Sequence, residues 1–220
     1  MKKHLFAAAL VLLTTLSCTD RLYEEGEYTD ILHVLAEPFD GIEVQDGFQL
    51  VLDPTVPPQE VKITVAENIH PYVTVRAEDG IVTVGLRSGV SYSELHLEAR
   101  VSPLGINLLS ASGGSTINAD YPLLRDNFDL YLSGGSQATL KGSVTNLHTS
   151  LSGGSRAKLQ DCYAQRLEAE LSGGSYECVS VIESLKLDAS GGSVFEYYGS
   201  PLQKVVNTSG GSKCDNLGKL

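Results

Sequence analysis

The chain has 220 residues, of which 42% are hydrophobic, and its 16 basic and 27 acidic residues give a net charge of −11 at pH 7. This length is enough to bury one sizeable hydrophobic core. The acidic surface disfavours binding to nucleic acid or to anionic lipid head groups, because both attract basic proteins. We therefore expect no nucleic-acid partner.

The N-terminus has the pattern of an export signal. Two lysines precede a mainly apolar run over residues 5–16, which is too short to cross a bilayer as a mature segment. The run ends in Leu16-Ser17-Cys18, which resembles the lipobox of bacterial lipoproteins, although Thr15 stands where that pattern usually has leucine. The resemblance implies cleavage before Cys18, acylation of this cysteine and a lipid anchor in a membrane. An ordinary signal peptide with a fortuitous cysteine is the alternative.

The rest of the chain divides into a tether and one domain. We expect a signal peptide at 1–17 and a lipidated tether at 18–37, where the sequence is polar and acidic. Strand-like sequence fills a single domain at 38–220, with N-terminal strands at 38–104 and a repeat at 105–220.

The repeat is the phrase Ser-Gly-Gly-Ser, which occurs six times at intervals of 18 to 21 residues. Before each copy apolar and polar residues alternate, as at Leu167, Ala169 and Leu171, and this period of two is typical of a half-buried strand. A unit of about 20 residues leaves no room for a crossover helix. We therefore predict a β-solenoid whose coils stack about 4.8 Å apart.

Each glycine pair is expected at a corner of the coil, because glycine reaches positive φ without a steric penalty. The flanking serines are expected to hydrogen-bond along the stack. A third inward position is expected at Leu124, Val144, Ala164, Ile182 and Leu202. The corner glycines are Gly113, Gly114, Gly134, Gly135, Gly153, Gly154, Gly173, Gly174, Gly191, Gly192, Gly210 and Gly211.

Other functions of glycine-rich sequences do not fit the phrase. A phosphate-binding loop needs a lysine followed by serine or threonine, and no copy has this pair. The calcium-binding nonapeptide repeat has a nine-residue period and an aspartate after its glycines. Six copies also argue against a single active site.

The N-terminal strands add a family resemblance. Alternating runs between residues 39 and 101 indicate strands, and Asp79-Gly80 between two of them predicts a hairpin. Together with Phe39-Asp40-Gly41-Ile42 and Glu67-Asn68-Ile69, the Ser-Gly-Gly repeat resembles the GIN domain family of auto-transporter adhesin heads. The resemblance implies an all-β fold, a right-handed parallel β-helix, and an envelope location. Antiparallel strands are expected to precede this helix.

Acidic residues are the main candidates for chemistry. Glu170 and Asp188 are expected on adjacent coils about 5 Å apart, which approaches the carboxylate spacing of a retaining glycosidase. With Glu168 they are weak candidate ligands for Ca²⁺. The alternative is a solvated surface ladder of His148, Glu168 and Lys186. We expect no cofactor and assign no metal site.

Once Cys18 is acylated, Cys162, Cys178 and Cys214 remain, and an odd number leaves at least one unpaired. Cys178 and Cys214 are expected two coils apart, too far for a disulfide, so we expect three buried or free thiols. His148 and Cys162 fall on different faces of the predicted coil, which argues against a thiol nucleophile. A sugar-stacking strip, or alternatively a mixture of core and rim, is expected at Tyr163, Tyr176, Tyr197 and Tyr198.

The sequence favours a non-enzymatic adhesion or binding module of the cell envelope, anchored in the outer membrane, with a glycan or a protein as ligand. A carbohydrate-active enzyme, by analogy with other β-helices, and a purely structural protein are the alternatives. Lys204 and Thr208 stand in otherwise apolar columns of the last coil. Its open end is expected to be covered by residues 217–220 or, less favoured, by a second copy.

Overall fold

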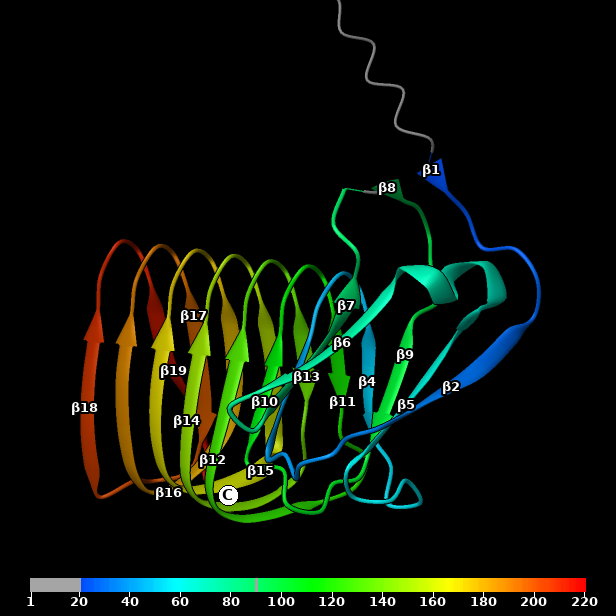
Figure 1. Cartoon of the computed structure of the whole chain (residues 1–220). Coiled ribbons are helices and arrows are strands. Elements are labelled where there is room, and N and C mark those ends of the chain that lie inside the picture. The colour runs from blue at the N-terminus through cyan, green and yellow to red at the C-terminus, as the bar shows by residue number, and fades with distance from the viewer. Residues whose placement is uncertain (1–20, 90) are drawn as a thin grey trace, which may run out of the picture.

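The computed structural model describes residues 21–89 and 91–220, so Cys18 and the predicted signal peptide lie outside the described residues. Seventeen strands form one sheet that is wound into a solenoid of about six turns (Figure 1). Two further strands, β1 (Arg21–Leu22) and β8 (Ser91–Tyr92), form a separate parallel pair. Within the described ranges no helix is long and apolar enough to cross a membrane.

The repeat forms parallel coils, as its period predicts. One face consists of β10 (Leu108–Ala111), β12 (Leu123–Leu132), β14 (Gly142–Leu151), the later parts of β15 (Arg156–Leu171) and β16 (Tyr176–Ala189), and β18 (Gln203–Thr208). A second face consists of β11 (Thr116–Asn118), β13 (Gln137–Thr139), the first parts of β15 and β16, β17 (Val194–Tyr198) and β19 (Lys213–Gly218). Each strand pairs in parallel with its equivalent one unit further along the chain.

The Ser-Gly-Gly-Ser phrases form the corners between these two faces, which Figure 1 shows as a row of arches. The first glycine of each pair has φ between +60° and +67°, and the second has φ between +77° and +82°. A Cβ atom on the first glycine would lie 2.9–3.2 Å from a backbone nitrogen of the neighbouring coil, whereas one on the second would meet nothing within 4 Å. The first glycine is therefore required both by its positive φ and by the close neighbouring backbone, whereas the second is required by its positive φ alone.

The corner serines bond mainly within their own turn. In four copies the last serine is buried and donates its hydroxyl to the carbonyl of the first, as Ser155 Oγ does to Ser152 O at 2.7 Å. The expected bonding along the stack involves a serine hydroxyl only at Ser115 and Ser212 among the described corners. The carbonyl of the same turn is the nearest acceptor for a hydroxyl that the corner buries.

The third side of the coil differs from the prediction. Val144 and Ala164 are buried as expected, but Leu124, Ile182 and Leu202 are exposed. The chain length of this side varies, and the β15–β16 pairing shifts register between Leu159 and Tyr163 and again between Ala164 and Arg166. Because a shift of one residue turns a side chain to the opposite face, counting from the phrase failed here.

The N-terminal strands continue the solenoid out of chain order. The strand β3 (Gly41–Val44) lies in parallel between β10 and β7 (Ile81–Leu86), and β4 (Gln49–Leu52) lies between β11 and β9 (Glu98–Val101). The coil formed by β3 and β4 is thus enclosed by two coils that follow it in the sequence. One hydrophobic core runs through these coils and the repeat.

Antiparallel strands cover the N-terminal end of this stack. The strand β5 (Glu60–Ala66) pairs with β9 and with β2 (Tyr28–Val34), and β6 (Val73–Glu78) pairs with β7. The predicted hairpin is confirmed, with Asp79-Gly80 between β6 and β7 at positive φ. A 3-10 helix, η1 (Glu67–Tyr72), places Ile69 in the core.

The C-terminal end has no such cover among the described residues. Residues 217–220 are exposed; β19 follows the coil, and Gly218 accepts a hydrogen bond from Gly199 N–H. The expectation that this segment covers the end is therefore wrong, because it continues the third side of the coil. At this end Lys204 Nζ lies 3.3 Å from Tyr197 Oη and 5.9 Å from the centre of the Tyr197 ring.

Candidate ligand-binding face

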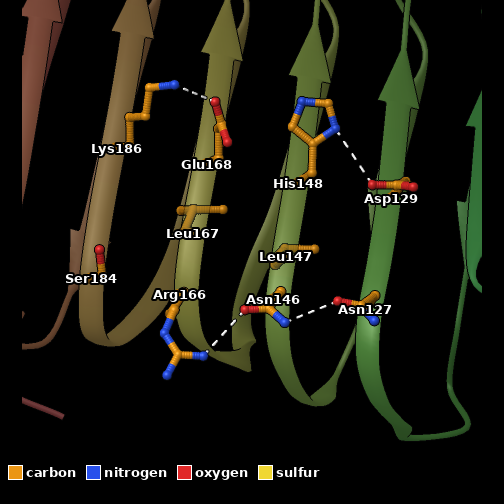
Figure 2. Close-up of a pocket in the computed structure, with 10 residues that line it drawn as sticks. All are labelled: Asn127, Asp129, Asn146, Leu147, His148, Arg166, Leu167, Glu168, Ser184 and Lys186. Carbon is orange, nitrogen blue, oxygen red and sulfur yellow. Dashed lines mark hydrogen bonds and ion pairs between the residues drawn. The ribbon is translucent and has the colours of Figure 1, made fainter.

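Two rows of polar side chains cross the face formed by β12, β14, β15 and β16 (Figure 2). In-register parallel pairing places equivalent residues on neighbouring strands about 4.8 Å apart, which turns columns of the sequence into rows on the surface. The charged row is Asp129, His148, Glu168 and Lys186, and the amide row is Asn127, Asn146, Arg166 and Ser184.

The charged row consists of two pairs. His148 Nδ1 lies 3.5 Å from Asp129 Oδ1, and Lys186 Nζ lies 2.5 Å from Glu168 Oε1. The hydrogen bond from Lys186 lowers the pKa of Glu168, and the same bond raises the pKa of Lys186. His148, Glu168 and Lys186 thus form the solvated surface ladder that was the alternative to a cation site.

The amide row is joined by side-chain hydrogen bonds. Asn146 Nδ2 donates to Asn127 Oδ1 at 2.9 Å, and Arg166 Nη1 donates to Asn146 Oδ1 at 3.3 Å. Arg166 also pairs with Glu183 at 3.3 Å. The two rows line an open depression of about 460 Å³, and Leu147 and Leu167, which alternate with them along the strands, are buried in the core. The depression therefore offers several hydrogen-bond donors and acceptors on an open surface.

The predicted acidic pair lies beside this face. Glu170 and Asp188 are in register on β15 and β16 and are exposed, and Asp188 accepts a hydrogen bond from Asn207 Nδ2 at 2.8 Å. Glu168 is held by Lys186 instead of joining them. Across residues 21–89 and 91–220 no group of three or more His, Cys, Asp or Glu residues could hold a metal ion.

The three described cysteines are free, as expected. Cys162 and Cys178 are buried and Cys214 is half-buried. Burial raises the pKa of Cys162 to about 12, so its thiol is protonated at neutral pH. His148 lies on the outer surface, and the structure does not bring it to Cys162.

The tyrosines belong partly to the core and partly to the surface. Tyr197 is buried and Tyr163 is exposed. Tyr176 packs under the guanidinium of Arg156, and its hydroxyl donates to Glu196 at 2.5 Å. The tyrosines are therefore a mixture of core and rim, and these rings do not form one exposed strip for stacking on sugars.

Sequence reasoning missed one buried ionisable side chain. Glu177 has no exposed surface, and Thr149 Oγ1 donates to its two carboxylate oxygens at 2.9 and 3.1 Å. Burial raises the pKa of Glu177 to about 8. The signal was available in the second position after each phrase, which reads Ile117, Ala138, Ala157, Glu177, Phe195 and Cys214.

The parallel coils, the open polar face and the single continuous core define this chain as a β-solenoid protein. The family described as "Putative auto-transporter adhesin, head GIN domain" matches residues 38–201. The chain belongs to this family. A comparison with curated proteins gave no match.

Solved structures share the fold at low sequence identity. A "putative adhesin" from Bacteroides fragilis superposes with a TM-score of 0.69 at 17% identity, covering 89% of this chain and all of that one. A "putative adhesin" from Parabacteroides merdae gives 0.50 at 16% identity, with 90% and 99% covered. A "putative lipid binding protein" from Parabacteroides distasonis gives 0.51 at 15% identity, with the same coverage.

Proposed function

We propose that the protein is a non-enzymatic adhesin that binds a polyhydroxylated chain, such as a glycan, on the face formed by β12, β14, β15 and β16. The observation that carries the proposal is the pair of polar rows around the open depression. Asparagine amides offer both donors and acceptors to hydroxyl groups, and arginine adds donors in a fixed geometry.

The shape of the site supports an extended ligand. Small-molecule sites are usually enclosed and mainly apolar, whereas this depression is open and polar side chains occupy the same two positions on each strand. A linear polymer crossing the strands would meet one polar group from each row about every 4.8 Å. The family and its adhesin relatives agree with a binding role at the bacterial surface or envelope.

The test is a glycan array followed by titration of the best ligand. Asn127→Ala with Asn146→Ala is expected to weaken binding at least tenfold, because both amides of the row are lost. Gln137→Ala with Thr139→Ala, on exposed positions of β13, is the matched control and should leave affinity unchanged. Unchanged affinity in the asparagine variant would refute binding at this face.

We further propose that Cys18 carries a lipid that anchors the domain in the outer membrane. The support is the apolar run ending at Leu16-Ser17-Cys18, followed by an acidic segment. Mass spectrometry of the membrane-extracted protein should show acyl chains on Cys18. A soluble mature protein with a free amine at its N-terminus would contradict the anchor.

A further inference from the structure

The last coil is the exposed end of the core. In the described part of the chain β18 pairs only with β16, and β19 pairs only with β17. Val206 and Cys214 pack against the core but are only partly buried. The same coil carries four exposed apolar side chains: Leu202, Val205, Leu217 and Leu220. The opposite end is covered by antiparallel strands and η1, so the two ends are not equivalent.

The free edge has a defined set of hydrogen-bonding groups. Ser209 N–H bonds to Ala189 O, and Lys213 N–H bonds to Ser193 O. The backbone groups of odd-numbered residues therefore point to the previous coil in β18 and, as far as Asn216, in β19, where the register shifts. Backbone groups of successive strand residues point to opposite sides. The even-numbered positions Lys204, Val206 and Thr208, and also Cys214 and Asn216, therefore turn their N–H and C=O groups toward the open edge.

We infer that a second copy of this chain covers this end, with the two last coils paired antiparallel across a two-fold axis. In β18 the register centred on Val206 lets the two Val206 residues exchange both backbone hydrogen bonds. It places Lys204 opposite Thr208 of the second copy, so that no lysine faces itself. The two valines extend the apolar core across the interface.

The second strand supplies reciprocal charges. In β19 the register centred on Cys214 places Lys213 opposite Asp215 of the second copy, and symmetry repeats the pair. Both side chains are exposed, and neither forms an ion pair in the described part of the chain. Opposite charges in directly opposed positions stabilise antiparallel strands, and like charges destabilise them. An unrelated strand would not be expected to match this pattern.

One axis can serve both strands. Val206 continues the column of Thr149 through Ala169 and Leu187, and Cys214 continues the column of Glu177 through Phe195. Thr149 and Glu177 contact each other across the core, so these two columns face one another. A two-fold axis along the line from Val206 to Cys214 passes through the centre of both registers. Because the other end is covered, the assembly closes as a dimer.

The first test measures mass and charge reciprocity. Sedimentation equilibrium of the full-length protein in density-matched detergent is expected to give a dimer with no larger species. Lys213→Asp places two carboxylates opposite each other at both symmetry-related contacts with Asp215, and it should raise the dimer dissociation constant at least tenfold. Lys213→Asp with Asp215→Lys restores opposite charges and should restore the dimer. Thermal unfolding of each variant checks that the fold is intact.

The second test probes the register. Diamide takes up two electrons and two protons as two thiols form one disulfide. Opposed residues in a hydrogen-bonded antiparallel pair have Cα atoms about 5.5 Å apart, within the disulfide range. The dimer should therefore become covalent through Cys214, and Cys214→Ser should abolish the cross-link without changing the mass in solution.

Several results would overturn the inference. They are a monomer at tens of micromolar protein, an open-ended series of oligomers, a dimer insensitive to Lys213→Asp, failure of the charge exchange to restore it, or a dimer that Cys214 does not cross-link.

Discussion

The corner of the β3–β4 coil and the corners of the repeat make the same turn with different residues. Residues 45–48 occupy the place of 112–115 in the stack. Asp46 has φ +59° where the repeat has its first glycine, and Gly47 has φ +85° where it has the second. Asp46 Oδ2 also accepts a hydrogen bond from Leu86 N–H at 2.9 Å. Positive φ is thus common to all seven corners, but glycine at the first position is not.

The difference comes from what lies outside each corner. In the repeat the first glycine packs on the backbone of another corner. Beyond Asp46 the coil of β7 and β9 makes no corner, because the chain leaves at residue 87 and returns at β9. The space that remains accepts a side chain. Stacking, more than the turn itself, therefore selects glycine at the first position.

The largest loss of stability is expected from a substitution at a corner that stacks on another corner. Gly153→Val places a Cβ atom 3.1 Å from Gly134 N at φ +63°, and it should lower the free energy of unfolding by about 3 kcal/mol or more. Gly154→Val has open space and only the strain of φ +78°, so about 1–3 kcal/mol is expected. Urea unfolding would measure both. Equal losses would show that stacking does not select the first glycine.

An intermediate effect on stability is expected from Glu177. This residue interrupts a column of inward-facing apolar side chains that extends to Leu50 of β4. Its pKa is raised from 4.5 to about 8, so the folded protein keeps a proton that the unfolded chain releases. Stability from this group is complete below pH 4.5 and is lost as pH rises to about 8, by an amount on the order of a few kcal/mol.

The variant Glu177→Gln should remove that pH dependence and unfold at higher temperature than the wild type at pH 8. Glu183→Gln, on the exposed side of the same strand, is the control. Melting temperatures measured from pH 4 to pH 9 provide the comparison. If the melting temperature of Glu177→Gln depends on pH as strongly as that of the wild type, another group is responsible for the pH dependence.

The smallest effect is expected at Asp46, where the N-terminal corner departs from the repeat. Asp46→Gly relieves positive φ but loses the acceptor for Leu86 N–H, so stability should fall by about 1 kcal/mol. Asp46→Asn keeps an acceptor and tolerates this conformation, and should be nearly neutral. The melting temperature of each variant provides the measurement. If Asp46→Gly raised it, glycine would be preferred at the first position of this corner, as it is in the repeat.

The repeat could be predicted from sequence because its corners and inward columns recur at fixed positions. The enclosed coil of β3 and β4 could not, because residues 45–48 share only a glycine with the phrase and its partners lie far along the chain. Leu124 and Ile182 were misplaced where the spacing varies. The charged row was visible in the outward columns. Asn127 and Asn146 of the amide row were not singled out, because uncharged polar residues at solvent-facing positions show neither a charge pattern nor a packing pattern.

The out-of-order stacking also determines the route by which the chain can fold. In the repeat a strand finds its partner one unit later, as Asp129 does with His148. Gly41 instead pairs with Ile81 and with Leu108, across much longer closed loops. Loop-closure entropy makes those pairings the slow ones. We expect closure around β3 and β4 to limit the folding rate, after which each repeat coil adds to a finished template and growth proceeds toward the C-terminus.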